Sequence, residues 1–168
     1  MLRLIGGGTE RDQIGSIGES IFRSRIMKFC DNRPYFSAHF LGEKFPVHDH
    51  LVNALSETII SAIFFAQIKS TLSGSKMRKD GRRYLNISVS RDDLSAMTQY
   101  PGPAYLFGVD IETERVYFVA IHGYVNKGIS GLPMDFEVTS ETIPILWSEV
   151  NEYWANRPTE HTSRFTII

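Results

Sequence analysis

The sequence predicts an α/β domain in which a mixed central β-sheet is flanked by helices. Two apolar runs, residues 51–55 and 59–66, lie close together and are typical of paired, buried strands. Two more apolar runs, 104–109 and 116–121, are separated by a spacing that suits a hairpin. Helical patterns precede and follow these strands, so we expect helices to cover the sheet.

The opening helix is expected to run from about residue 9 to about residue 31. Thr9 and Asp12 have the spacing of a capping box at its start. Glycines in a helix interior are costly, and the two here indicate a close approach of the helix to the sheet. One side of this helix carries Gly15, Gly18, Phe22, Ile26 and Phe29, with Ile14 and Ile21 beside them.

The remaining elements follow in chain order. Residues 35–40 are predicted as a strand or loop, 56–58 as the turn of a hairpin, and 84–89 as an alternating strand. Ser90 and Asp93 have the spacing of a cap for a short helix that ends near residue 99. Residues 123–136 resemble a loop. The last helix is predicted over 145–155, with its start at Ser140 or Thr142 and with Pro144 allowed in its first turn. Residues 165–168 could add an edge strand.

Length and composition indicate one soluble globular domain over residues 1–168. The sequence is 42% hydrophobic and 22% charged, which is ordinary for that class. Cys30 is the single cysteine, which excludes an internal disulfide, fits a reducing cytoplasm and favours a small core residue. No apolar stretch reaches the ~18 residues of a membrane span, and no signal peptide is expected. The net charge of −1 does not itself indicate a nucleic-acid binder.

The most informative polar residues are Asp49 and the run Gln67, Ile68 and Lys69. The run ends a buried strand, and side chains alternate along a strand, so Gln67 and Lys69 are expected on one face and Ile68 on the other. Asp49 lies at the start of the neighbouring strand, residues 51–55, which is predicted to pair with this buried strand. A strand that becomes polar only at its end, and on one face, is typical of a functional site at a sheet edge.

These residue types suit metal-dependent cleavage of phosphodiester bonds. Mg²⁺ prefers oxygen ligands, commonly one or two carboxylates with water and phosphate. Asp49 would supply the carboxylate and Gln67 a weaker, neutral oxygen. Lys69 would orient the attacking water and stabilise the charge on the phosphate. A purely structural alternative is an Asp at the edge of the core beside a Lys whose stem packs on apolar surface.

Two other features bear on function. His48 and His50 flank Asp49 and could indicate zinc, although no third and fourth ligand is evident nearby. The segment 73–83 is basic and begins a few residues after Lys69, so it could bind a phosphate backbone or simply be a solvated loop. Its cationic residues are Lys76, Arg78, Lys79, Arg82 and Arg83.

Together these motifs resemble those of the PD-(D/E)XK, or restriction-endonuclease-like, nuclease superfamily. The closest likeness is to a small bacterial branch of uncharacterised domains with a Gln-x-Lys motif. The resemblance extends over most of residues 11–155, and its matching pieces are 14–19, Asp49, 67–71, 103–110 and 115–119.

The resemblance implies a restriction-endonuclease-like fold and a nuclease that uses Mg²⁺ or Mn²⁺. It assigns Asp49, Gln67 and Ile68 to the metal, with Asp49, Gln67 and Lys69 in catalysis and Glu19 as an accessory acid on the first helix. It implies a nucleic-acid partner, DNA first, no membrane, and a setting in bacterial antiviral defence or DNA processing. A homodimer and a partner defence protein remain open as further partners.

Two departures from the superfamily pattern define the alternative function. Gln67 stands where Glu or Asp is commoner, and Val47-His48 precede Asp49 where a glycine-rich approach is usual. The alternative is therefore a catalytically weak or inactive subunit that keeps the nuclease fold and binds nucleic acid or protein. A third hypothesis is a structural protein whose polar cluster only stabilises the sheet.

Overall fold

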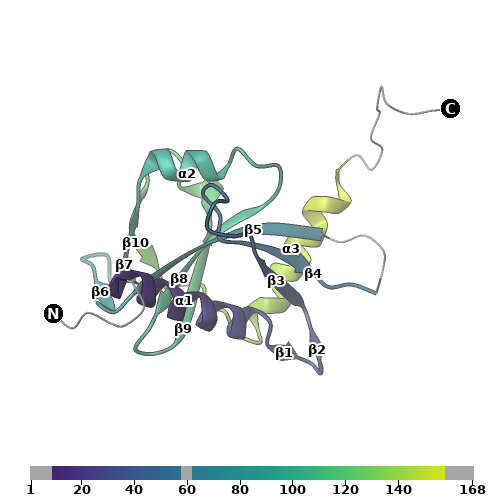
Figure 1. Ribbon diagram of the computed structural model, residues 1–168, viewed down its shortest axis with the longest axis horizontal. Helices are drawn as coiled ribbons and strands as arrows, with labels where there is room; N and C mark the ends of the chain where they lie inside the picture. The colour runs from purple at the N-terminus through teal and green to yellow at the C-terminus, as the bar shows by residue number, and fades with distance from the viewer. Residues whose placement is uncertain (1–8, 58–61, 158–168) are drawn as a thin grey trace.

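The computed structural model describes residues 9–57 and 62–157, and its centre is a five-stranded sheet (Figure 1). Neighbouring strands run antiparallel except β5 and β8, which are parallel. The sheet is therefore mixed, as predicted. In spatial order its strands are β3 (Phe36–Phe40), β4 (His50–Ala54), β5 (Ala62–Thr71), β8 (Ala104–Asp110) and β9 (Arg115–Ala120).

Two helices, α1 (Glu10–Ile26) and α3 (Thr142–Ala155), cover one face of this sheet (Figure 1). Alternate residues of β5 point into this layer because strand side chains alternate between faces. The core on this side joins Phe64, Ala66 and Ile68 of β5 with residues of both helices, among them Phe22, Ile26, Ile143, Leu146 and Val150. The prediction of an α/β protein with helices packed on a mixed sheet is confirmed.

The opposite face is covered by a second, three-stranded sheet and by α2 (Arg91–Met97). Inward residues of the small sheet, such as Leu85 and Ile87, pack with Phe65 and Leu106 of the large one. In spatial order the small sheet contains β10 (Ile129–Pro133), β7 (Arg83–Val89) and β6 (Ser75–Met77); a 3-10 turn, η1 (Ile121–Gly123), completes the layer.

The predictions of loops at 73–83 and 123–136 were wrong in part, because β6 and β10 lie within them. β6 has only three residues, too few for a readable alternation. β10 is interrupted by a register shift between Ser130 and Leu132, where Gly131 has φ +102°. A bulge with a left-handed glycine breaks the period of two on which strand prediction depends.

The first helix is shorter than predicted, because it ends at Ile26 rather than near residue 31. β1 (Phe29–Cys30) and β2 (Arg33–Pro34) then form a hairpin. Asp31 and Asn32 at its turn have φ of +50° and +61°, the left-handed pair of a tight hairpin turn. Such a pair cannot continue a right-handed helix, and Phe29 is 66% exposed instead of lying on the helix face.

Most other predicted elements are confirmed. Thr9 and Asp12 form the capping box, and the Ser90 side chain accepts a hydrogen bond from the Asp93 N–H at the start of α2. The hairpin of β8 and β9 and the antiparallel pairing of β4 with β5 are also present. The predicted strand at 165–168 and part of the predicted 56–58 turn lie outside the described residues.

Two sequence predictions concern burial and membranes. Cys30 is buried, as expected of a small core residue. Among the described residues, no helix has the length and apolar character needed to cross a membrane.

Candidate functional site

Asp49 lies immediately before β4, beside the middle of β5. The prediction that Gln67, Ile68 and Lys69 end their strand was wrong, because β5 stays paired with β8 as far as Thr71. The backbone N–H of Asp49 donates to the Ala66 carbonyl, which continues the ladder between β4 and β5. Its Oδ2 accepts two hydrogen bonds, from Gln67 Nε2 at 2.8 Å and from the Ile68 backbone N–H at 2.7 Å. The carboxylate is therefore held in one orientation by two groups of β5.

Asp49, Gln67 and Lys69 line one cavity of about 250 Å³. The predicted alternation is confirmed, since Gln67 and Lys69 share this cavity while the Ile68 side chain packs in the core under α1 and α3. Ile68 therefore reaches the site only through its backbone. The other residues that line the cavity are Phe45, Val47, His48, Val89, Asp93 and Met97.

The electrostatics of the site reflect partial burial of its acids. Burial raises the pKa of Asp49, while the Ile68 N–H, the charge of Lys69 and the Gln67 amide oppose that rise. Burial, and then the charge of Asp49, raises the pKa of Glu19 on α1. Glu19 thus lies within electrostatic range of Asp49, although it is not among the residues that line the cavity.

Asp93 is a site residue that sequence reasoning missed. Its Oδ2 accepts a hydrogen bond from Ser90 Oγ at 2.7 Å. In the sequence, the spacing of Ser90 and Asp93 predicts only a helix cap. The first turn of α2 places Asp93 among the residues that line the cavity. No local signal in the sequence reveals this, because the contact depends on how α2 packs over the large sheet.

The two histidines beside Asp49 do not share a face. His48 donates from Nε2 to the Met97 carbonyl at 2.9 Å and stacks on Phe65, on the α2 side of the sheet. His50 instead contacts Phe22 of α1. Val47 has a left-handed φ of +62°, so the backbone here is not a regular strand. Across residues 9–57 and 62–157, no three His, Cys, Asp or Glu side chains are grouped to hold a metal, and the zinc alternative loses its basis.

The cavity is lined by a sparse set of oxygen donors. Asp49 and Asp93 offer two carboxylates. With Nε2 of Gln67 donating to Asp49, Oε1 is the atom of that amide that could coordinate an ion. Mg²⁺ commonly binds one or two carboxylates and completes its shell with water and substrate phosphate, which matches this sparse set.

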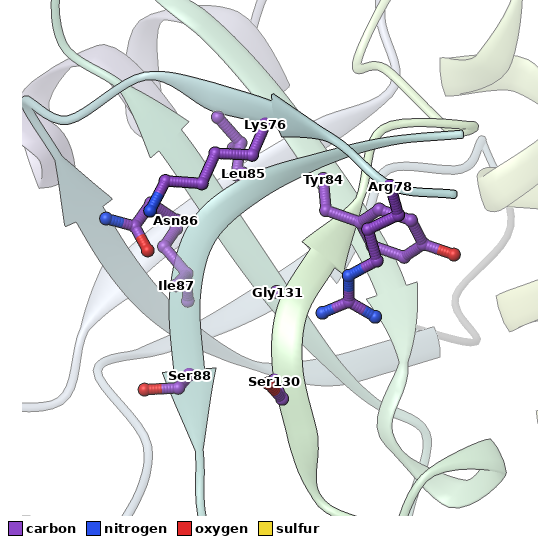
Figure 2. A pocket seen from close by; sticks show the side chains of 9 residues that line it. All are labelled: Lys76, Arg78, Tyr84, Leu85, Asn86, Ile87, Ser88, Ser130 and Gly131. Atoms are coloured by element: carbon purple, nitrogen blue, oxygen red, sulfur yellow. The ribbon is translucent and has the colours of Figure 1, made fainter. Parts of the chain in front are cut away.

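The structure separates the basic residues of 73–83. Lys76 and Arg78 line a cavity of about 340 Å³ on the small sheet (Figure 2). Arg82 and Arg83 line a different cavity, and Lys79 is exposed between them. None of the five is among the residues that line the Asp49 cavity.

Comparison of the chain with protein-family models, with curated proteins and with solved structures finds no match.

Proposed function

We propose that the chain is a Mg²⁺- or Mn²⁺-dependent nuclease with a restriction-endonuclease-like arrangement of its site. One observation carries the proposal. An acid before β4 and an amide and a lysine in the second half of β5 line one cavity, and the acid accepts two hydrogen bonds. The spacing of Gln67 and Lys69 on one strand face and the neighbouring Asp49 is the arrangement that the sequence resemblance implied.

Each residue has a chemical role in this proposal. Asp49, Asp93 and Oε1 of Gln67 would hold the ion, and the Ile68 N–H and the Gln67 amide orient the Asp49 carboxylate. A bound divalent ion supplies an activated water and neutralises charge on the scissile phosphate. Lys69, whose side chain is exposed, is free to contact that phosphate and to orient the water.

Cleavage assays test the proposal directly. Fluorescently labelled single-stranded DNA, duplex DNA and RNA are incubated with the protein and Mg²⁺ or Mn²⁺, and then with EDTA. Asp49→Asn and Lys69→Gln should each lower the cleavage rate on the order of 10²-fold or more, since Asp49 would hold the ion and Lys69 would contact the reacting phosphate. Asp92→Asn and Lys28→Gln, which make the same changes at exposed positions, should leave the rate unchanged.

The alternative function is a non-catalytic subunit that binds nucleic acid. The hydrogen bond from Gln67 to Asp49 favours it, because a neutral amide that donates to the acid can serve structure alone. Nucleic-acid binding without metal-dependent cleavage of any of the three substrates would establish this alternative. Cleavage that persists in Asp49→Asn would refute the assignment of the site.

A further inference from the structure

The outward face of the small sheet is polar and continuous. Along β7, Tyr84, Asn86 and Ser88 alternate with Leu85, Ile87 and Val89, which are buried against the large sheet. Lys76 of β6 pairs with Tyr84, and Ser130 of β10 pairs with Ser88. Because directly paired residues of neighbouring strands share a face, three strands contribute to one polar surface.

Lys76 and Arg78 are the cations of this surface. Their cavity is otherwise lined by Tyr84, Asn86, Ser88, Ser130 and Gly131 and by the edges of Leu85 and Ile87. Figure 2 shows Lys76 beside Asn86 on one side of it and Arg78 on the other. No carboxylate is among these lining residues, although Asp80 accepts a hydrogen bond from the Tyr84 hydroxyl nearby. The lining itself therefore presents two positive charges among neutral hydrogen-bonding groups, and the carboxylate of Asp80 lies within electrostatic range of Arg78.

The guanidinium of Arg78 is held in place. It lies 4.1 Å from the centre of the Tyr84 ring. A Cβ added at Gly131 would stand 2.8 Å from Arg78 Nη2, so the absence of a side chain at Gly131 makes room for the guanidinium. A planar fork of donors that is fixed between a ring and the backbone suits bidentate recognition of phosphate.

The neighbouring basic cavity has a different charge balance. Arg82, Arg83 and Arg115 line it together with Asp135 and Glu137, and Arg115 lies 3.6 Å from Glu137. Acids therefore neutralise much of the positive charge there. This contrast identifies the Lys76–Arg78 cavity as the better anion site of the two.

The Lys76–Arg78 cavity and the candidate active site lie on opposite faces of β7. Ser88 lines the former, and the next residue, Val89, lines the cavity of Asp49 and Lys69. Pairing of β6 with β7 ends at Leu85, while β7 continues to Val89. The Asn86 N–H still donates to the Gly74 carbonyl, so within the described sheet only residues 87–89 of β7 lack a neighbour from the β6 segment, and a ligand that serves both cavities would have to pass this edge.

We propose that the Lys76–Arg78 cavity binds the phosphate backbone of a single nucleic-acid strand; for this substrate class the inference rests on the proposed function. Lys76 and Arg78 contact phosphates, and Asn86, Ser88 and Ser130 contact sugars or base edges. A volume of about 340 Å³ accommodates a small group rather than a duplex. A single strand can bend past the edge of β7 at residues 87–89, and in this proposal the same strand extends to Lys69.

Binding is measured by fluorescence anisotropy with a labelled single-stranded DNA 15-mer, in EDTA so that cleavage plays no part. Lys76→Gln/Arg78→Gln should weaken binding on the order of tenfold and reduce the slope of log affinity against log salt by about 1.4, that is, ~0.7 per phosphate contact. Arg82→Gln/Arg83→Gln removes the same two charges and should have little effect. Arg78→Lys, which keeps the charge but loses the fork, should lie between parent and double variant.

The inference that Lys76 and Arg78 bind phosphates would be overturned by no binding of the parent protein, by an equal loss of affinity in both double variants, or by an unchanged salt slope. The inference that the ligand is a single strand would be overturned by tighter binding of a duplex of the same length, or by full competition from a mononucleotide. Thermal unfolding shows whether each variant is folded. If no cleavage is found but the two double variants differ as expected, the proposed nuclease function fails and the binding site stands.

Discussion

Gly18 of α1 lies directly against Ser70 of β5. A Cβ added at Gly18 would stand 1.7 Å from Ser70 Oγ and 2.7 Å from Ser70 Cβ, far inside contact distance. The helix can approach the end of β5, close to Asp49, only because this position lacks a side chain. By contrast, a Cβ at Gly15, one turn earlier, would meet nothing within 4 Å.

Gly18→Ala should therefore lower the free energy of unfolding by about 1–3 kcal/mol, the usual cost of overpacking. Gly15→Ala should raise it by about 0.5–1 kcal/mol, since alanine favours a helix and the space is open. Urea denaturation of the two variants measures both. In the Gly18→Ala background, Ser70→Gly should recover much of the loss, and purely additive effects would show that the contact is not the cause.

A second prediction concerns the hydrogen bond from Gln67 to Asp49. Gln67→Glu would place two carboxylates in contact, so one of them should have a raised pKa. A raised folded-state pKa means that the stability of this variant falls as pH rises through that pKa. Mn²⁺ should offset the repulsion, and it should therefore raise the melting temperature of Gln67→Glu more than that of the parent.

Gln99→Glu adds the same charge at an exposed position and is the matched control. Its melting temperature should respond to Mn²⁺ like the parent's. Equal responses of parent, Gln67→Glu and Gln99→Glu at millimolar Mn²⁺ would show that the cavity does not bind the ion through position 67.

Much of this site was predictable because it depends on short-range periodicity. The alternation of Gln67, Ile68 and Lys69 follows from strand geometry, and the pairing of β4 with β5 follows from two apolar runs near each other. Asp93 was not predictable, since its place depends on how α2 packs against the large sheet. The separation of Lys76 and Arg78 from Arg82 and Arg83 required β6 and β7, and β6 is too short to give a strand signal.

A third prediction follows from Asp93 on the cavity wall. Asp93→Asn should weaken Mn²⁺ binding on the order of tenfold, or about 1.4 kcal/mol. Two unit charges ~4 Å apart interact by ~4 kcal/mol at an effective dielectric of ~20. The expected loss of binding free energy is well below that figure, because Asp93 is exposed and solvent screens its charge. Asparagine can still accept from Ser90 Oγ, so the helix cap is retained. Calorimetric titration measures the affinity.

Asp92→Asn is the control for this change. Asp92 lies on the same helix, but its side chain is 91% exposed and faces Arg91. If Asp92→Asn and Asp93→Asn weaken Mn²⁺ binding equally, the effect is one of general charge, and Asp93 has no special place in the site.

The pH dependence of stability should be dominated on the acid side by His50. Its side chain is 1% exposed and packs against the rings of Phe22 and Phe40. Neither ring nitrogen has a hydrogen-bond partner within the described part of the chain. Burial first, and then the charge of Arg23, lowers the pKa of His50 to about 4.

When the pKa of a histidine is lower in the folded protein, the unfolded chain binds the proton more tightly than the folded protein does. The contribution of His50 to stability is therefore complete above the ordinary pKa of about 6.5 and is lost as pH falls towards 4. The loss should be on the order of 3 kcal/mol at the acid end.

His50→Phe keeps an aromatic ring between Phe22 and Phe40 and takes up no proton, so its stability should fall much less over this range. Urea denaturation from pH 7 to pH 4 compares this variant with the parent and with His122→Gln, an exposed histidine that should behave like the parent. Parallel pH profiles for the parent and His50→Phe would show that another group, such as His48, causes the acid loss.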